Sequence, residues 1–261
     1  MTPSAGKHLE TVVADGVCTI TFRRPEAFNA LDEEMAVGLV RQLTEAVADD
    51  SIRGVVITGS GGAFSAGADL NGENPVANFD ERTMDGANMI IRSITGLGKP
   101  VVAAVNGVAA GVGASICFAA DLAIAQRSAA FLLAFSRIGL MPDGGASLTV
   151  AASVGRSRAM RMALLAEPIT AEEAHEKGLV SHLVEDDEFD AVVAKVAGRL
   201  ASGPPIAFAA TKKAINAATL GGLEQALERE RTGQLVLFGT EDAAEGTRAF
   251  VQKRRPTFVG R

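Results

Sequence analysis

The chain has 261 residues, of which 48% are hydrophobic and 21% charged, with a formal net charge of −6. This composition can bury the core of one large domain, and the negative charge argues against a general nucleic-acid-binding protein. No uncharged apolar run is long enough to cross a bilayer, and residues 1–10 lack a signal-peptide pattern. The two cysteines, Cys18 and Cys117, lie in apolar surroundings, so we expect reduced thiols in a cytoplasmic protein.

The first half of the chain alternates strand and helix patterns. Residues 16–25 alternate apolar and polar side chains up to a proline, which is typical of a strand. Residues 29–50 carry apolar side chains at helical spacing, and Asp32 is placed to cap that helix. Further buried strands are predicted over 53–62, 99–107 and 121–125, and further helices over 79–97 and within 107–120. The alternation predicts an α/β fold.

From Ala146 onward the pattern is mostly helical. Thr170 and Glu173 form a capping-box signature, a short strand is expected at 181–184, and a helix at 187–202. The glycines expected to end or interrupt helices are Gly178, Gly221, Gly222 and Gly239. We expect an α/β core over residues 1–200 and a helical region over residues 201–261.

Two glycine-rich loops follow buried strands, at 59–70 and 106–116. The first lacks the Gly-Lys-Ser/Thr ending of a phosphate-binding loop. The second has Ile116 where a dinucleotide fingerprint needs glycine or alanine, and no suitable acid follows about 20 residues on. Each loop could instead direct one backbone N–H at a shared oxygen, helped by a helix that starts after Gly111. Alternatively, the glycines only allow helix and strand to pack closely.

A serine nucleophile is a competing interpretation. Ser115 lies in "GVGASIC", which is not the Gly-x-Ser-x-Gly elbow of serine hydrolases. The three histidines are His8, expected in a loose tail, and His175 and His182, expected at the surface. Because no base is evident, Ser115 is interpreted as a packed helix residue. No cysteine and histidine cluster has metal-ligand spacing, so no metal site is predicted.

Asp143 is the remaining candidate for chemistry. The sequence Pro142-Asp143-Gly144 is typical of a solvated turn. It also follows the strongly apolar stretch 129–141 and precedes a small-residue helix start. A carboxylate in such surroundings gains proton affinity through desolvation, which suits it to proton transfer. From the residues alone both interpretations stay open.

Seven stretches in this order resemble the crotonase superfamily, which comprises the enoyl-CoA hydratases and isomerases, over nearly the whole chain. They are "RRPEAFNALDEEM", "FSAGADL", "KPVVAAVNGVAAGVGASI", "DLAIA", "F…RIGLMPDGGAS", "AEPITAEEAHEKGLVSHLV" and "PPIAFAATKKAI". The resemblance implies a spiral of repeated β-β-α units with a helical C-terminal region that forms trimers or hexamers. It also implies a bent acyl-CoA thioester as substrate and no metal or redox cofactor.

The resemblance further assigns site residues. The backbone N–H groups of Ala68 and Val112 would form the oxyanion hole that binds the thioester oxygen. The other expected substrate-binding positions are Ala27, Ala66, Asp69, Leu70, Gly111 and Phe135.

Two departures from the family pattern bear on the reaction. Ser115 and Phe135 stand where the hydratases carry their two glutamates, so water addition lacks its usual acid and base. Asp143 stands where certain isomerases carry a catalytic aspartate, most closely those of phenylacetate catabolism that act on ring-1,2-epoxyphenylacetyl-CoA. We therefore expect an enoyl-CoA isomerase with Asp143 as the base. The alternatives are an atypical hydratase, a non-catalytic acyl-CoA-binding protein and, more remotely, a hydrolase that uses Ser115.

Overall fold

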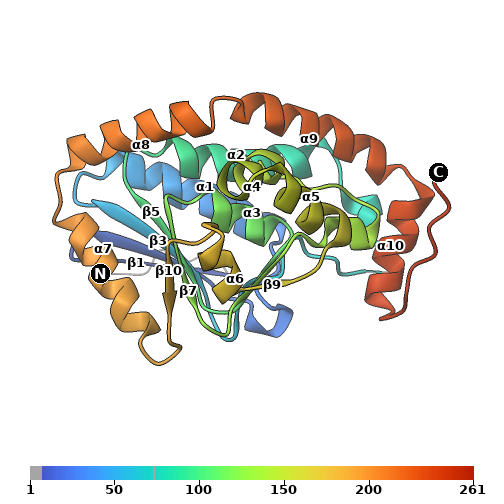
Figure 1. Ribbon diagram of the computed structural model, residues 1–261, viewed down its shortest axis with the longest axis horizontal. Coiled ribbons are helices and arrows are strands. Elements are labelled where there is room, and N and C mark those ends of the chain that lie inside the picture. Colours follow the sequence, from blue (N-terminus) through green and yellow to red (C-terminus); the bar gives the residue numbers. More distant parts are fainter. Residues whose placement is uncertain (1–7, 73) are drawn as a thin grey trace.

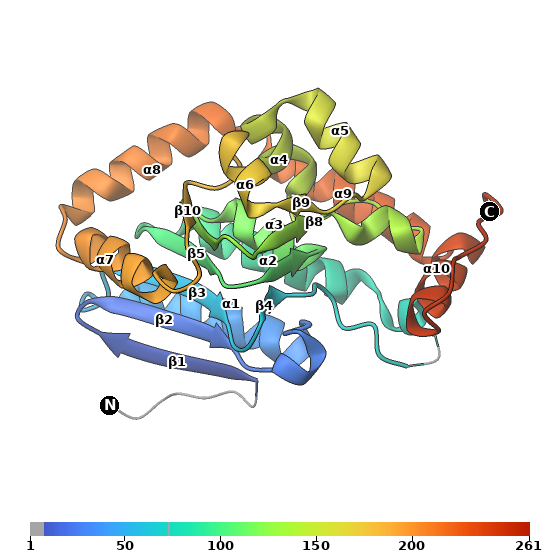
Figure 2. The ribbon, with the colours of Figure 1, turned by 60° about the horizontal axis from the view of Figure 1, so that its bottom comes forward.

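The computed structural model describes residues 8–72 and 74–261. It contains two β-sheets with helices packed around them (Figures 1 and 2). Residues 1–7, most of the stretch predicted to lack a signal peptide, lie outside the described residues. The larger sheet has the order β1 (Leu9–Ala14), β2 (Val17–Phe22), β3 (Gly54–Gly59), β5 (Val101–Val105), β7 (Leu122–Gln126), β10 (His182–Val184). The smaller sheet has the order β4 (Ala63–Ser65), β6 (Val108–Ala110), β8 (Ala130–Leu132), β9 (Ile169–Thr170).

Three consecutive β-β-α units build the core. In each unit the first strand joins the large sheet, the second joins the small sheet, and a helix follows. The units are β3–β4–α2 (Glu81–Gly96), β5–β6–α3 (Val112–Ala119) and β7–β8–α4 (Ala146–Val154). Equivalent strands pair in parallel within each sheet, so the carboxyl ends of β4, β6 and β8 meet at one edge. The predicted spiral of β-β-α units is confirmed.

Both faces of the large sheet are buried, which explains why its inner strands are apolar throughout. Val55 and Ile57 face the main core, whereas Val56 between them packs with residues of α7 (Phe189–Ala201) on the opposite face. The apolar side of α1 (Glu33–Ala48) also packs into the main core. The side chain of Asp32 caps the first turn of α1 by accepting a hydrogen bond from the N–H of Met35. The predicted cap is therefore present.

The N-terminal strand β1 was not predicted. It pairs antiparallel with β2 through a tight turn in which Asp15 and Gly16 both have positive φ, as a type I′ hairpin turn requires. His8, just before this strand, is half-buried, and its Nδ1 lies 2.7 Å from an Asp32 carboxylate oxygen. The expectation of a loose tail was wrong for His8, because a partner 24 residues away fixes it.

Two short helices, α5 (Arg156–Leu165) and α6 (Ala171–Glu176), follow α4, and Thr170 caps α6 through the N–H of Glu173 as predicted. The C-terminal helices are α8 (Pro205–Thr219), α9 (Leu223–Phe238) and α10 (Glu241–Val251), broken at the predicted glycines. Helices α8 and α9 run along one side of the molecule and α10 lies at its end (Figure 1). None of the helices in the described ranges is long and apolar enough to span a membrane.

The boundary expected near residue 200 coincides with the turn between α7 and α8. Leu223 and Leu227 of α9 and Ala243 of α10 nevertheless belong to the main hydrophobic core. Helix α8 is tied to the core by Lys212, whose Nζ lies 2.8 Å from Asp121 Oδ2 and donates to the Ile94 carbonyl. The two-part division itself stays a prediction.

Replacing Lys212 with methionine should destabilise the protein, because it removes the cation beside the Asp121 carboxylate, whose side chain is 21% exposed, and leaves it the hydrogen bond from Val101 N. Losing a hydrogen bond to a charged group costs about 1.5–3 kcal/mol. Lys213→Met is the matched control, since Lys213 is the exposed neighbour and should change stability by less than about 0.5 kcal/mol. Urea unfolding of both variants measures this, and equal stabilities would contradict the structural role of Lys212.

Candidate active site

The residues singled out in the sequence converge at the carboxyl ends of three parallel strands. Strand β4 leads into the loop with Ala68, β6 leads through Gly111 into α3, and β8 leads into a short 3-10 helix (Ala134–Ile138) and on to Asp143. Since neighbouring parallel strands end at the same edge of a sheet, the topology alone brings the three loops together.

Among the N–H groups of residues 66–69, that of Ala68 is the one left free. The N–H of Ala66 donates to Phe28 O, that of Gly67 to the Ser65 hydroxyl, and that of Asp69 to Leu31 O. Ala68 forms an isolated parallel bridge with Leu31, which directs its own N–H to the other side of the loop. No partner for the Ala68 N–H occurs among the described residues.

Val112 is the first residue of α3, so its N–H has no acceptor within the helix. The N–H of Gly111, in contrast, is used by Leu132 O of β8 at 2.9 Å, and Gly111 has a φ of 53°. Among the described residues no partner is recorded for the Val112 N–H. It therefore lies at the positive end of the α3 dipole and is available to an acceptor.

The two glycine loops touch backbone to backbone. A Cβ on Gly67 would lie 2.8 Å from the carbonyl oxygen of Ala110, and one on Gly113 would lie 2.6 Å from that of Ser65. Side chains at either position would force the loops apart. The close packing and the two free N–H groups thus occur together, so the two interpretations of these glycines do not exclude each other.

Asp143 lies in a buried turn rather than a solvated one, with 8% of its surface exposed. Gly144 and Gly145 both have positive φ and turn the chain into α4. The Asp143 carbonyl accepts the Ser115 hydroxyl at 2.8 Å. Because Ser115 lies three residues after Val112 on α3, the Asp143 loop packs against the same side of that helix, about one turn from the free N–H.

The two carboxylate oxygens of Asp143 have different surroundings. Oδ2 accepts a hydrogen bond of 2.8 Å from Gln234 Nε2. Oδ1 is buried and has no hydrogen-bond partner among the described residues. Desolvation raises the pKa of Asp143 from 3.8 to about 7; the Gln234 hydrogen bond lowers it, and the charge of Glu230 adds to the rise. Asp143 therefore exchanges its proton near neutral pH, as a general base requires.

Ser115 has the structural role that the sequence favoured. Its side chain is fully buried, and its hydroxyl is donated to a backbone carbonyl rather than held by a base. The described histidines have other partners: Asp32 for His8, the Val180 carbonyl for His175, and Ser181 for His182. His175 is exposed, as predicted, and His182 is half-buried. No described histidine contacts Ser115, so the arrangement offers no serine-based nucleophile.

The remaining predicted positions surround the loops. Ala27 ends the 3-10 turn Pro25–Ala27, and Ala66 is exposed beside the free N–H of Ala68. The carboxylate of Asp69 lies 2.8 Å from Arg24 Nη1, while Leu70 is partly buried against the core. Phe135 is buried with 6% of its surface exposed. The roles assigned to these residues, to Gly111, and to Ala68, Val112 and Asp143 stay predictions.

Two buried polar residues of α9, Glu230 and Gln234, were not singled out in the sequence analysis. Glu230 is 1% exposed and accepts hydrogen bonds from the N–H groups of Gly145 and Ser147 at the start of α4. Gln234 is fully buried and contacts Asp143. Their spacing of four residues places both on one helix face, but nothing local tells which distant loop that face meets.

Within the described ranges, no three His, Cys, Asp or Glu side chains lie together in a way that could hold a metal ion. Cys18 and Cys117 are free and buried, and burial raises the pKa of the Cys18 thiol to about 11. The three neighbouring loops thus supply one desolvated carboxylate and two N–H groups that have no partner among the described residues. Groups of these kinds are typical of enzymes that transfer a proton next to a carbonyl and stabilise the resulting oxyanion.

Comparison with known proteins agrees with this class. The family model described as "Enoyl-CoA hydratase/isomerase" matches residues 13–261. The chain is 39% identical to the 1,2-epoxyphenylacetyl-CoA isomerase of Escherichia coli K12, over 95% of this chain and 97% of that protein. It is 37% identical to the 2,3-dehydroadipyl-CoA hydratase of the same organism, over 94% and 96%. The crystal structure of an enoyl-CoA hydratase from Mycobacterium avium subsp. paratuberculosis K-10 superposes with a TM-score of 0.91 at 46% identity, covering 97% and 98%.

The chain belongs to the enoyl-CoA hydratase/isomerase family, and the predicted crotonase fold is confirmed. This family acts on acyl-CoA thioesters. Isomerases and hydratases both occur among the relatives, so the family alone does not decide the reaction.

Burial of Asp143 should cost stability above neutral pH. Because its folded pKa is raised to about 7, the folded state holds a proton that the unfolded state has lost between pH 3.8 and 7. Stability therefore falls as pH rises through this window. Asp143→Asn should remove the loss and be more stable than the parent at pH 8, by at most about 4 kcal/mol, with a smaller difference at pH 5. Chemical unfolding at both pH values measures this.

The control for that measurement is Asp187→Asn, since Asp187 is exposed. It should leave the difference in unfolding free energy between pH 5 and pH 8 unchanged. An Asp143→Asn variant with the parental pH dependence would show that Asp143 titrates at an ordinary value.

Proposed function

We propose that the protein is an enoyl-CoA isomerase that moves a double bond from the 3- to the 2-position of an acyl-CoA thioester, with Asp143 as its only acid–base group. The observation that carries the proposal is the desolvated carboxylate of Asp143, whose Oδ1 has no partner among the described residues. The main-chain carbonyl of Asp143 accepts the Ser115 hydroxyl of α3, three residues after Val112, so the Asp143 turn packs against the first turn of that helix. The similarity to an isomerase over nearly the full chain supports it.

The reaction needs one proton transfer in each direction. Asp143, ionised, takes a proton from C2 of the 3-enoyl thioester, and the electrons of the C2–H bond spread over the dienolate onto the thioester oxygen. The N–H groups of Ala68 and Val112 stabilise that oxygen by hydrogen bonds in a site with little water. Asp143 then returns the proton to C4, which leaves the double bond between C2 and C3. Proton transfer of this kind needs no metal or redox group.

Water addition is the second candidate, since a hydratase is among the similar proteins. It would need groups that hold and activate a water molecule. Ser115 and Phe135, at the positions of the hydratase glutamates, are both buried, and neither can transfer a proton from water at neutral pH. A non-catalytic acyl-CoA-binding protein would not need a carboxylate that is costly to bury. Both points favour isomerisation.

The proposal extends to the wider predictions about this protein. It acts in the cytoplasm as a trimer or a pair of trimers, with residues 201–261 forming the contacts between subunits. Ala27, Ala66, Asp69 and Leu70 lie along the CoA portion of the substrate, and Gly111 and Phe135 beside its acyl portion.

Asp143→Asn should lower kcat for conversion of a 3-enoyl-CoA to the 2-enoyl-CoA by about 10²–10⁴-fold, because the amide cannot accept the proton. KM should change little, since substrate binding is left in place. Absorbance of the conjugated thioester follows the reaction, and mass spectrometry separates isomerisation, which leaves the mass unchanged, from hydration, which adds one water. Wild-type turnover by Asp143→Asn would refute the proposal.

Gly113→Ala should reduce kcat/KM by about 10-fold or more, because its Cβ would meet the Ser65 carbonyl and displace the start of α3 from the Ala68 loop. Gly86→Ala is the matched control: Gly86 also lies in a helix, but an added Cβ meets nothing within 4 Å. It should leave kcat/KM unchanged and raise stability by about 1 kcal/mol. The same assay measures both, and equal activities would argue against a paired oxyanion site.

A further inference from the structure

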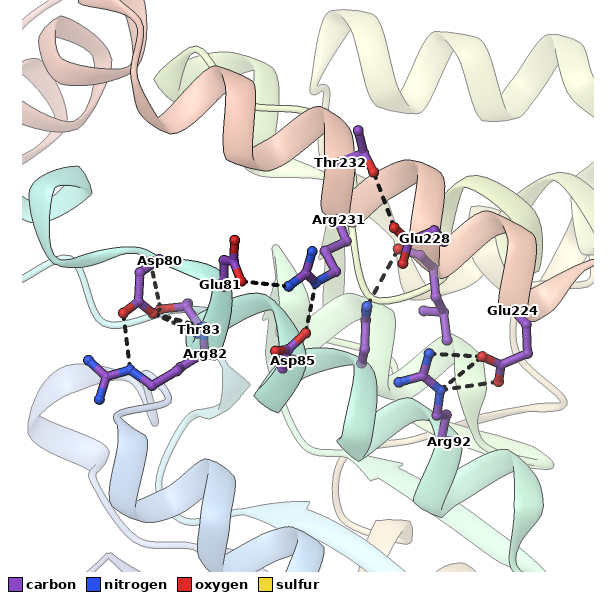
Figure 3. A network of polar contacts seen from close by, with 12 residues as sticks. Asp80, Glu81, Arg82, Thr83, Asp85, Arg92, Glu224, Glu228, Arg231 and Thr232 are labelled. Atoms are coloured by element: carbon purple, nitrogen blue, oxygen red, sulfur yellow. Dashed lines mark hydrogen bonds and ion pairs between the residues drawn. The ribbon is translucent and has the colours of Figure 1, made fainter.

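Helix α9 packs against α2 and also contacts the Asp143 loop, and ion pairs join the side of α9 that faces α2 to that helix (Figure 3). Arg231 lies 2.8 Å from Asp85 and 3.2 Å from Glu81, and Arg92 of α2 lies 2.8 Å from Glu224. Single exposed pairs contribute little, but these three pairs, formed by two arginines at different points along the same two helices, define the register of the helices. The inward face of α9, with Glu230 and Gln234, is thereby held against the Asp143 loop.

Gln234 makes contacts at both ends of the three-residue segment that carries the base. Its Oε1 accepts from Met141 N at 3.3 Å, and its Nε2 donates to Met141 O at 2.9 Å and to Asp143 Oδ2 at 2.8 Å. One fully buried amide thus fixes the backbone at Met141 and the side-chain rotation at Asp143. A glutamine amide has two donors and one acceptor oxygen, and all of these groups are in use.

We propose that Gln234 is the positioning residue of this active site: by holding Oδ2 of Asp143, it leaves Oδ1 as the oxygen that takes and returns the substrate proton. The inference rests on the proposed function and adds a residue from a helix that carries none of the predicted site residues. A carboxylate with one oxygen fixed presents a single oxygen in one orientation to C2 and C4, as efficient proton transfer requires.

The hydrogen bond from Gln234 also lowers the proton affinity of the Asp143 carboxylate, whereas its buried surroundings raise it. Burial and the charge of Glu230 raise the pKa of Asp143, and the bond from Gln234 lowers it. Glu230 is the charged side chain that faces Asp143 from α9; α3, α4 and the Asp143 loop contribute no other carboxylate or cation among the described residues. Loss of the Gln234 donor therefore moves the pKa of Asp143 upward.

The test uses Gln234→Met, which keeps the side-chain length but removes both donor and acceptor. In the 3-enoyl to 2-enoyl assay we expect kcat to fall by about 10–100-fold with KM within about 3-fold of the parental value. The acidic limb of the kcat/KM pH profile should move to higher pH. Gln234→Glu, which keeps the acceptor for the Met141 N–H but places a second carboxyl beside Asp143, should move the limb in the same direction. Thermal melting identifies any variant that does not fold.

Gln42→Met is the matched control. Gln42 is also buried and also donates to a carboxylate, Glu45, but it lies on α1. Its kcat and pH profile should equal those of the parent. A parental pH limb in both Gln234 variants, or a loss of kcat accompanied by an equal rise in KM, would overturn the positioning role. If Asp143→Asn is inactive while the Gln234 variants behave as Gln42→Met does, only this inference fails; wild-type turnover by Asp143→Asn would remove the proposed function as well.

Discussion

Burial of the Asp143 carboxylate is the constraint on which the rest of the site depends. A carboxyl group placed in a dry interior loses hydration, and its proton becomes harder to remove. Among residues 8–72 and 74–261, Gln234 is the one side chain that donates a hydrogen bond to this carboxylate, and Oδ1 has no partner there. Such a group is unfavourable for stability but suited to exchange a proton near neutral pH. The stability of the fold and the chemistry of the site therefore make opposite demands at this residue.

The spiral of β-β-α units brings two backbone N–H groups and one side-chain carboxylate to the same edge of the small sheet. The loop after β4 supplies a free N–H at Ala68, the helix after β6 supplies one at Val112, and the chain after β8 supplies the carboxylate. Glycines allow the first two loops to touch, and helix α9 covers the third. Because each feature follows a short parallel strand, their relative positions are set by the pairing of β4, β6 and β8.

Local patterns predicted the parts of the fold that depend on local interactions. The helix caps at Asp32 and Thr170 were predicted correctly, because each cap and the N–H group that it binds are three residues apart. The breaks in the C-terminal helices were also predicted, because they depend on the glycines themselves. The short strands of the small sheet were not predicted, since two or three residues carry no periodicity. His8 and Gln234 could not be placed, because their partners are 24 and 91 residues away and only the folded chain brings them together.

For the site itself, the residues alone left both the glycine loops and Asp143 ambiguous, and the family resemblance supplied their expected roles. The structure connects two observations that the sequence presents separately, the serine at position 115 and the aspartate at position 143. A Cβ on Gly144 would lie 2.9 Å from Ser115 Cβ, and the Ser115 hydroxyl donates to the Asp143 carbonyl. A side chain as long as glutamate at position 115 would need the space that this loop occupies. The small residue at 115 therefore lets the Asp143 turn pack against α3, so the missing carboxylate and the retained one are parts of a single packing arrangement.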